Sequence, residues 1–378
     1  MALLDAYSAD LAALADRDRL RGLSPRAGVD FASNDYLGLA ESSLYRDAAQ
    51  EALARGVPLG AGGSRLLRGN HPEIELLEAE AARFFGSEST LFFGAGFTAN
   101  EALLSTAPQR GDLILHDALV HASCHEGMRL SRAQSRAFAH NDCGALEAAI
   151  RAFRQEGGVG RLWIVVESLY SMDGDMAPLA ELAQIAERER AFLVIDEAHA
   201  TGVYGPGGRG LAHGLEGRND IITLHTCGKA LGLSGALLCL PSVLREFMIN
   251  RCRPFIFATA PSPLLAASVR AALDIIARAG DRRAALQARV ARLAQGLSRA
   301  GVTVSRTHIQ PVIVGADSRA LSLARRMQTA GYDIRAIRPP TVPVGESRLR
   351  ISVTLNAREE DIDAMTARLA LELERLSA

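Results

Sequence analysis

The sequence predicts an α/β protein, with a large domain built on a mostly parallel sheet and a smaller C-terminal α+β domain. Short, uniformly apolar runs alternate with helical segments through the middle of the chain, and this alternation changes after about residue 270. Apolar runs of this kind are typical of strands buried on both faces of a parallel sheet. We expect an N-terminal segment over 1–40, the large domain over 41–270 and the C-terminal domain over 271–378.

The individual elements are predicted in chain order. A short N-terminal helix over about 2–21 precedes a glycine-rich loop over 60–71, and His71-Pro72 begins a helix whose apolar residues recur at helical spacing. Six buried strands are expected at 90–93, 113–116, 162–167, 192–196, 221–226 and 235–240. A helix over 264–278 ends the large domain. An amphipathic helix follows it, with strands near 302–305, 311–314, 333–337 and 348–353 and two more helices.

Composition narrows the classes of function. The 378 residues include 42 basic and 43 acidic side chains, for a formal net charge of −1, which argues against coating nucleic acid or an anionic membrane. The start lacks the basic and apolar regions of a signal peptide, and no apolar run approaches the roughly 20 residues that span a bilayer. The five cysteines form no Cys-x-x-Cys pair. We expect a cytoplasmic protein with no nucleic-acid partner, no membrane partner and no metal site.

One basic residue differs from all the others. Of the 42 basic residues, 41 are arginine and only Lys229 is lysine. Codon preference explains most of such a bias, and one lysine surviving by chance is the alternative explanation. Because arginine stays protonated and does not form Schiff bases, the exception indicates that a reactive amine is needed at position 229.

Groups that carry chemistry follow several predicted strands. Ligands of open α/β sheets bind at the carboxyl ends of strands, and the free N–H groups of a helix start bind phosphate. A Gly94-Ala95-Gly96-Phe97 run opens a helix after the first strand. Later strands are followed by Asp117 and His121, by Ser168 and Ser171, by Asp196 and His199, and by Thr226 and Lys229. A phosphate cradle, a carboxylate, histidines, hydroxyls and one amine are the groups that pyridoxal phosphate requires.

Longer runs make this interpretation specific. The chain resembles the α-oxoamine synthases over essentially its whole length, in the runs NDYLGL (34–39), SMDGDMAPLAEL (171–182), DEAHATGVYGPGGRG (196–210), TCGKALG (226–232) and IRPPTVPVGESRLR (337–350). The resemblance implies the aspartate-aminotransferase fold (fold type I), pyridoxal 5′-phosphate as cofactor and an acyltransferase reaction. The run IRPPTVP is similar to the branch that condenses L-alanine with pimeloyl-CoA or pimeloyl-ACP in biotin biosynthesis. Sister enzymes that join glycine or serine to other acyl groups are the alternative.

The resemblance also implies roles at the cofactor ring. Lys229 would hold the cofactor and then move the Cα proton of alanine. Asp196 would pair with the pyridine nitrogen, and His199 would reach the ring oxygen. His121 would stack on the ring and guide the acyl substrate.

Phosphate binding is implied for a second group of residues. Gly96 and Phe97 would provide N–H contacts, helped by the hydroxyls of Ser171 and Thr226. Thr259 would contact the phosphate of a neighbouring subunit, since the family forms homodimers with shared active sites.

The substrate would be held by residues from both ends of the chain. The resemblance places Asn34 and Arg350 on the substrate carboxylate and Thr341 in the substrate site. Arg348 points to the same strand face as Arg350, so periodicity does not choose between them and the choice rests on the resemblance. Arg21 would also contact substrate, but the stretch between Arg21 and Asn34 is shorter than is usual in the family, which leaves its role open.

Two other enzyme classes share parts of the pattern. Gly94-x-Gly96-x-x-Ala99, between a strand and a helix, fits a dinucleotide-binding fingerprint, with Asp117 near the required distance. A nicotinamide dehydrogenase would nevertheless leave Lys229 unexplained. The letters DEAH at 196–199 also spell a helicase box, but the phosphate-binding loop that a helicase requires is missing.

Overall fold

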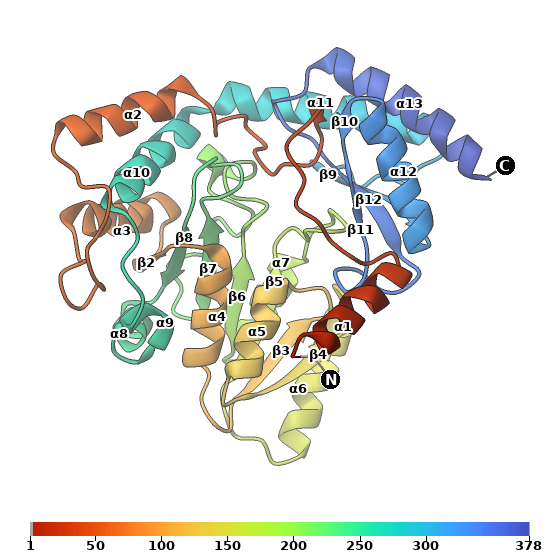
Figure 1. Ribbon diagram of the computed structural model, residues 1–378. Coiled ribbons are helices and arrows are strands. Elements are labelled where there is room, and N and C mark those ends of the chain that lie inside the picture. Colours follow the sequence, from red (N-terminus) through yellow and green to blue (C-terminus); the bar gives the residue numbers. More distant parts are fainter. Residues whose placement is uncertain (1–2, 378) are drawn as a thin grey trace. The chain divides into compact units, whose positions relative to one another are not determined.

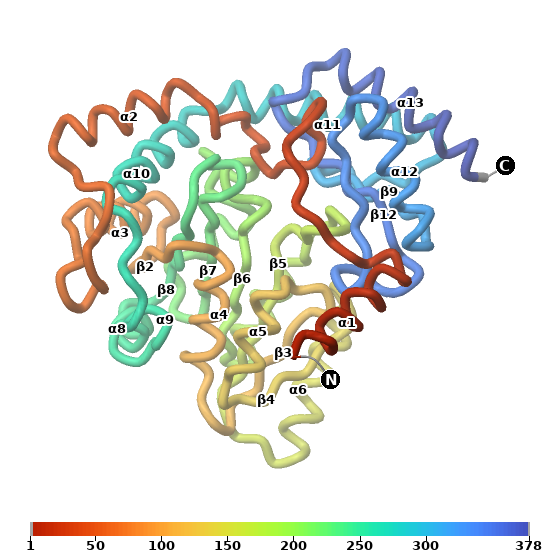
Figure 2. The backbone as a smooth tube through the Cα atoms, in the orientation of Figure 1, coloured from red at the N-terminus to blue at the C-terminus, as the bar shows by residue number. Residues whose placement is uncertain are grey.

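The computed structural model describes residues 3–377, whose helices and strands are drawn in Figure 1 and whose backbone is traced in Figure 2. The chain falls into two compact units. Unit 1 contains the residues up to 36, residues 172–175 and the residues from 284 onward, and unit 2 contains 37–171 and 176–283. This division differs from the expected limits, because the N-terminal segment groups with the C-terminal residues. The boundary also lies beyond residue 270, because helix α10 (Pro263–Arg278) packs on α3 (Pro72–Phe85) inside unit 2.

Unit 2 is built on a seven-stranded sheet in the order β2-β8-β7-β6-β5-β3-β4. β8 pairs antiparallel with β2 and with β7, and every other pair in this sheet is parallel. The strands are β2 (Ser89–Phe93), β3 (Leu113–Asp117), β4 (Gln134–Phe138), β5 (Leu162–Glu167), β6 (Phe192–Asp196), β7 (Ile221–Thr226) and β8 (Ala236–Leu240). All six predicted strands and the mostly parallel sheet are confirmed. The edge strand β4 was missed because its polar side chains form no apolar run.

Helices cover both faces of this sheet, which is why its inner strands are mostly apolar. Ile164 and Val165 are neighbours in β5 but belong to separate hydrophobic clusters, one on each face. The Val165 cluster includes residues of α4 (Gly96–Thr106), α5 (Ala122–Leu130), α8 (Ser242–Arg251) and α9 (Arg253–Ile256). The Ile164 cluster includes residues of α6 (Cys143–Gln155) and α7 (Leu179–Glu189). Unit 2 also contains α2 (Ser43–Ala54) and the short helix η1 (Pro206–Gly208).

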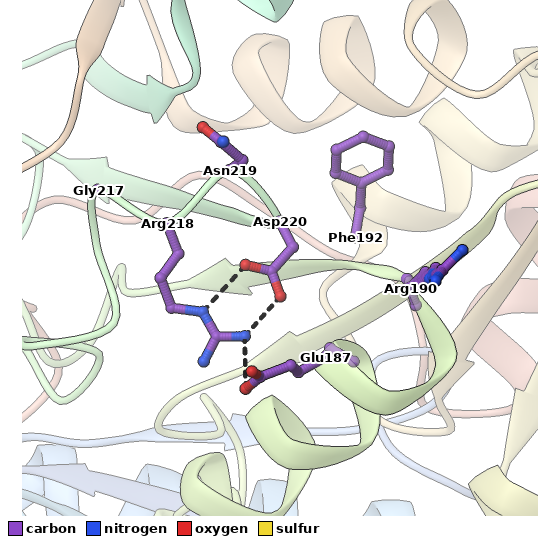
Figure 3. A pocket seen from close by; sticks show the side chains of 9 residues that line it. Glu187, Arg190, Phe192, Gly217, Arg218, Asn219 and Asp220 are labelled. Atoms are coloured by element: carbon purple, nitrogen blue, oxygen red, sulfur yellow. Dashed lines mark hydrogen bonds and ion pairs between the residues drawn. The ribbon is translucent and has the colours of Figure 1, made fainter.

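The amino-terminal edge of the sheet carries a cleft of about 670 Å³. It lies where β6 and β7 begin, and Phe192 and Arg190 are among its lining residues (Figure 3). On the wall of the cleft, Arg218 Nη2 lies 2.6 Å from Asp220 Oδ2 and 3.5 Å from Glu187 Oε2. The cleft is therefore at the edge opposite to the predicted site residues, which follow the carboxyl ends of the strands.

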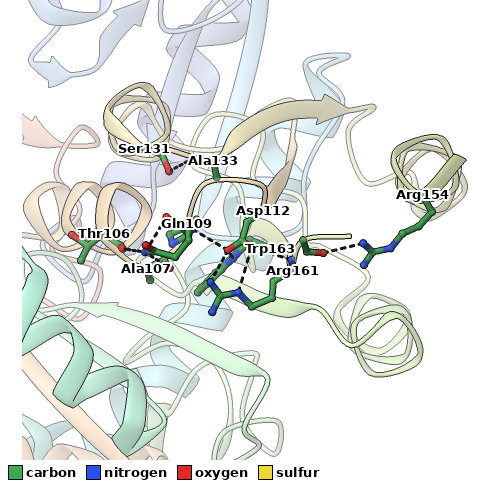
Figure 4. A network of polar contacts seen from close by, with 11 residues as sticks. Thr106, Ala107, Gln109, Asp112, Ser131, Ala133, Arg154, Arg161 and Trp163 are labelled. Atoms are coloured by element: carbon green, nitrogen blue, oxygen red, sulfur yellow. Dashed lines mark hydrogen bonds and ion pairs between the residues drawn. The ribbon is translucent and has the colours of Figure 1, made fainter. Parts of the chain in front are cut away.

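A buried carboxylate fixes the same edge of the sheet between β3 and β5. Asp112 accepts hydrogen bonds from Gln109 N at 2.9 Å, from Arg161 N at 3.0 Å and from Trp163 Nε1 at 3.2 Å (Figure 4). These bonds join the turn after α4 to the start of β5. Because the two strands begin in a fixed register, their carboxyl ends reach the opposite edge together.

Unit 1 is a smaller α+β unit. Its antiparallel sheet has the order β11-β12-β9, and β1 pairs in parallel with β10, which brings the N-terminal residues to the C-terminal part of the chain. The strands are β1 (Val29–Asp30), β9 (Ile309–Gly315), β10 (Tyr332–Asp333), β11 (Arg335–Ile337) and β12 (Ser347–Ser352). The helices are α1 (Asp5–Asp16), α11 (Gly280–Arg299, which starts in unit 2), α12 (Asp317–Thr329) and α13 (Glu359–Ser377).

Two local predictions in unit 1 are corrected. The strand expected near 302–305 does not form, because the Ser305 backbone N–H bonds the Gln310 side chain and no strand partner. The helix expected over 2–21 ends at Asp16, since Asp18 takes a left-handed conformation with φ 56°. Residue 2 lies outside the described residues.

Neither a membrane span nor a metal cluster is found in the described chain. Between residues 3 and 377, no helix is long and apolar enough to cross a membrane. The same residues contain no group of three or more His, Cys, Asp and Glu side chains placed to hold a metal ion. All five cysteines are free and buried.

Candidate active site

The carboxyl edge of the unit 2 sheet brings together the only lysine and a histidine. Lys229 follows β7 in a tight turn, and its Nζ lies 2.8 Å from His199 Nε2. His199 is buried, in the segment that follows β6. The fold thus places a primary amine against an imidazole although 30 residues separate them in the sequence.

Asp196 ends β6 at the same edge and is held by two donors. Its Oδ1 accepts from Ala198 N at 2.9 Å, and its Oδ2 accepts from Asn100 Nδ2 at 2.7 Å. Asp196 is 6% exposed. Because both oxygens are engaged, the orientation of this carboxylate is fixed by the protein. Sequence analysis missed Asn100, which looks like an ordinary residue of the helix after the glycine run.

His121 lies at the start of α5, where its ring serves as the helix cap. Its Nδ1 accepts from Ser123 N at 3.3 Å, and its ring meets Phe97 edge-on with centroids 6.4 Å apart. Burial is the main cause that lowers the pKa of His121, and the nearby Lys229 lowers it further, whereas Asp196 raises it. The imidazole is therefore uncharged near neutral pH.

The first turn of α4 forms a cradle of backbone N–H groups. The helix starts at Gly96, and its N-cap residue Ala95 provides no side-chain cap, so these N–H groups are available to a ligand. A Cβ on Gly96 would lie 3.4 Å from Thr226 Oγ1, which places that hydroxyl beside the helix start. The buried Ser171 donates its N–H to Glu167 Oε2 at 3.2 Å.

Thr259 is placed differently from the other predicted phosphate ligands. It is exposed, and it forms an isolated antiparallel bridge with Ser64.

Glu167 is a second buried carboxyl group at this edge. It ends β5, pairs in register with Asp196 of β6 and is 2% exposed. Burial, and then the neighbouring Asp196 charge, raise the pKa of Glu167 to about 8. Its Oε1 has no hydrogen-bond partner among the described residues. The sequence signal was present, since this glutamate ends a predicted strand, but its pairing with Asp196 needs the strand order.

The predicted carboxylate-binding pair lies in unit 1. Arg350 Nη2 donates to Asn34 Oδ1 at 3.1 Å, and Nη1 donates to Ser352 Oγ at 3.1 Å. The hydroxyl of Tyr36 donates to Asn34 Oδ1 at 2.9 Å and lies 3.4 Å from Arg350 Nη2. Asn34 and Arg350 are thus brought together across 316 positions, and Tyr36, which is fully buried, was not predicted.

The structure separates the two arginines that periodicity could not distinguish. Arg348 is paired with carboxylates, with Asp173 at 2.5 Å and Glu346 at 3.0 Å. Arg350 bonds the side chains of Asn34 and Ser352 instead. A guanidinium that already holds two carboxylates is a poor receptor for a third, so Arg350 is the better candidate for an anionic ligand. Elsewhere in unit 1, Arg21 Nη2 lies 3.4 Å from Thr341 Oγ1.

These residues fit pyridoxal phosphate when tested on the geometry of unit 2. An amine, a buried carboxylate with a fixed orientation and an uncapped helix start with an adjacent hydroxyl all belong to one sheet edge. The unpartnered Oε1 of the buried Glu167 also indicates a place for a ligand with a polar group.

Comparisons with known proteins agree with this geometry. The sequence profile of the family "Aminotransferase class I and II" matches residues 26–369. The 8-amino-7-oxononanoate synthase of Anaeromyxobacter dehalogenans is 40% identical over 387 aligned positions, which cover 98% of this chain and 96% of that protein.

Solved structures give the same result for the fold. A serine palmitoyltransferase containing pyridoxal phosphate superposes with a TM-score of 0.89 and 25% identity, covering 99% of this chain and 98% of that one. The 8-amino-7-oxononanoate synthase of Francisella tularensis superposes with a TM-score of 0.77 and 25% identity, covering 93% and 99%.

Proposed function

Since this chain belongs to the 8-amino-7-oxononanoate synthase family, within the class I and II aminotransferases, we propose that it condenses L-alanine with a pimeloyl thioester. The reaction releases carbon dioxide and the thiol and yields 8-amino-7-oxononanoate for biotin biosynthesis. The observation that carries the proposal is the contact of Lys229, the only lysine amine, with His199 at the edge where Asp196 ends β6. The chain is an enzyme, a pyridoxal-phosphate-dependent acyltransferase.

Residues of unit 2 would hold the cofactor. Lys229 would bind it through the amine, and the Asp196 carboxylate would keep the pyridine nitrogen protonated. The N–H groups of Gly96 and Phe97 would bind the phosphate. When bound, pyridoxal phosphate supplies an electron sink for the charge that develops on the substrate Cα.

Hydroxyls, imidazoles and the partner subunit would complete the cofactor contacts. Ser171 and Thr226 would donate to the phosphate, His199 would bond the ring oxygen, and His121 would lie on the ring face. Thr259 would act on the phosphate of the second subunit of a homodimer.

Residues of unit 1 would hold the substrate. Arg350 and Asn34 would bind the carboxylate of alanine, because Arg350 offers N–H groups next to a polar amide. Thr341 would line the substrate site, and Arg21, whose Nη2 lies 3.4 Å from Thr341 Oγ1, would contact substrate beside it. Lys229, once released from the cofactor, would take the proton from the alanine Cα and return one to the product carbon.

Exposed apolar residues support the proposal of a homodimer. The loops around Ser64 and Thr259 pair with each other, and Ala260 N donates to Gly63 O at 2.9 Å. The same two loops expose Leu59, Leu66, Leu67 and Phe257. Apolar side chains gathered on paired loops are typical of a surface that another subunit covers. The buried, free cysteines suit a reducing compartment, and we propose that the enzyme works in the cytoplasm.

Thiol release from a panel of acyl donors tests the proposed function. Pimeloyl-CoA and pimeloyl-ACP are each offered with alanine, and acetyl-CoA, succinyl-CoA and palmitoyl-CoA are each offered with glycine or serine. The proposal predicts a clear preference for alanine with a pimeloyl thioester, and the two pimeloyl donors identify the natural carrier. A preference for glycine with a short acyl group would instead identify another α-oxoamine synthase of the same fold.

A further inference from the structure

A chain of hydrogen bonds joins Asp196 to His121 within unit 2. The Asn100 amide nitrogen donates to Asp196 Oδ2 at 2.7 Å and to Ser123 Oγ at 3.0 Å. Ser123 Oγ lies 2.8 Å from His121 Nδ1. Asn100 is 2% exposed and Ser123 is fully buried, so bulk water does not compete for these bonds.

The direction of each bond follows from the Asp196 end. A carboxylate oxygen accepts, so the Asn100 atom that faces it is the amide nitrogen, and its second N–H points to Ser123 Oγ. Since Ser123 Oγ accepts from Asn100, its own hydrogen is free to bond His121 Nδ1. Asp196 thus determines the orientation of the Asn100 amide, and that amide determines the orientation of the Ser123 hydroxyl.

Two donors then meet on the same histidine nitrogen. Ser123 N donates to His121 Nδ1 at 3.3 Å, in the geometry of a helix cap, and Ser123 Oγ, whose hydrogen is not used by Asn100, lies 2.8 Å from the same nitrogen. A nitrogen that accepts two hydrogen bonds cannot carry a proton. The His121 ring is therefore neutral, with its hydrogen on Nε2.

We propose that Asn100 and Ser123 are positioning residues that transmit the orientation of the Asp196 carboxylate to His121 and hold its imidazole in the Nε2–H form. In this form Nε2 offers a hydrogen-bond donor and is not available as a base. For turnover, this inference rests on the proposed function. Nε2–H would donate to the acyl carbonyl oxygen as that oxygen gains negative charge, and no proton would be transferred.

The tautomer of His121 tests this proposal without any catalytic readout. The measurement is the ¹⁵N spectrum of ring-labelled histidines in the full chain, with and without pyridoxal phosphate, with His121 identified by loss of its signals in His121→Gln. We expect an unprotonated Nδ1 and a protonated Nε2 at neutral pH, and a mixture of both tautomers in Ser123→Ala. Ser268→Ala is the matched control, because Ser268 is also a buried helical serine but its hydroxyl donates to the backbone oxygen of Leu264, at 2.9 Å.

The pH dependence gives a second readout that a purely structural role would not change. The ionisable groups that act on His121 are Asp196 from β6, Lys229 after β7 and His125 on its own helix. Loss of the Ser123 hydroxyl makes Nδ1 easier to protonate, so the pH at which the ¹⁵N signal of Nδ1 changes should move to higher values. The kcat for thiol release should fall about tenfold, as expected for one lost hydrogen bond, with the KM for alanine within twofold of wild type.

A double-mutant cycle tests the chain of hydrogen bonds from Asn100 through Ser123 to His121. Because Asn100 acts on His121 only through Ser123, adding Asn100→Ala to Ser123→Ala should change the tautomer ratio no further. A proton on Nδ1 in the wild type, or a tautomer ratio unchanged in Ser123→Ala, would overturn the proposal. Additive effects of the two substitutions on that ratio would do the same. If the wild type released no thiol from any acyl donor, the proposed function would fail, while the spectra would still decide the state of His121.

Discussion

Arg350 and Arg348 provide a matched pair in which the same substitution should have different effects. They lie two residues apart on β12, with Arg350 8% exposed and Arg348 1% exposed. We consider Arg350→Lys and Arg348→Lys. Lysine keeps the positive charge but loses the planar fork that binds a carboxylate through two parallel bonds.

The expected magnitudes follow from the partners of each arginine. Losing one charge-assisted bond to the substrate costs about 1.5–3 kcal/mol, so Arg350→Lys should raise the KM for alanine roughly 10- to 150-fold. Arg348 holds Asp173 and Glu346, whose side chains are 33% and 51% exposed. Water can therefore solvate a carboxylate oxygen that the fewer contacts from lysine leave without a partner. Arg348→Lys should therefore lower the free energy of unfolding by only about 1–2 kcal/mol and leave the KM unchanged.

Steady-state thiol release at varied alanine, together with thermal unfolding, separates the two effects. The KM for the acyl thioester serves as the internal control, since it should stay within twofold of wild type in both variants. If Arg348→Lys raised the KM for alanine while Arg350→Lys did not, the assignment of Arg350 to the substrate carboxylate would be refuted.

Three further predictions follow from individual contacts. Asp196→Asn should still bind pyridoxal phosphate, as read from its absorbance, but should lower thiol release at least ~100-fold, because an amide does not hold the pyridine proton; near wild-type turnover would contradict this. Because burial raises the pKa of Glu167 from 4.5 to about 8, the folded state holds a proton that the unfolded state loses. The free energy of unfolding should therefore fall as pH rises from about 4.5 to about 8. The thermal unfolding midpoint of Glu167→Gln should fall less than that of the wild type over the same pH range. Gly210→Ala should destabilise far more than Gly214→Ala in thermal unfolding. Both glycines have positive φ, which costs roughly 1 kcal/mol for alanine, but only a Cβ on Gly210 would lie 1.9 Å from Glu197 Oε2; equal losses would argue against that contact.

The strands of unit 2 could be predicted because burial on both faces gives a strong local signal. Leu162–Glu167, for example, is apolar until its last residue, and each of its residues is buried. The edge strand Gln134–Phe138 gives no such signal, because only Phe138 is buried. The antiparallel direction of β8 could not be predicted either, because an apolar run is compatible with a parallel or an antiparallel strand.

The candidate site was predictable where a residue stands at the end of a strand or in the turn that follows it. Asp196 ends β6 and Lys229 lies in the turn after β7, and the carboxyl ends of neighbouring strands meet at one edge. The sequence does not reveal which side chains bond them. Asn100 reaches Asp196 across 96 positions, and Glu167 lies beside it only because β5 and β6 pair in register.

The two units also show why domains cannot be predicted as continuous stretches of the sequence. β1 pairs with β10, so Asn34 and Arg350 meet although they stand near opposite ends of the sequence. A two-residue strand such as Val29–Asp30 has no pattern that would indicate its partner. The pairing of these ends depends on tertiary contacts, and no short stretch of the sequence indicates them.

The most direct test of the central claim is the position at which the cofactor is attached. The chain is incubated with pyridoxal phosphate, reduced with borohydride, digested and analysed by mass spectrometry, with Lys229→Ala as control. We predict one modified peptide, the one that contains Lys229 in the run HTCGKALG, and none in the control. The cofactor mass on the N-terminal amine alone, or wild-type turnover retained by Lys229→Ala, would contradict the account.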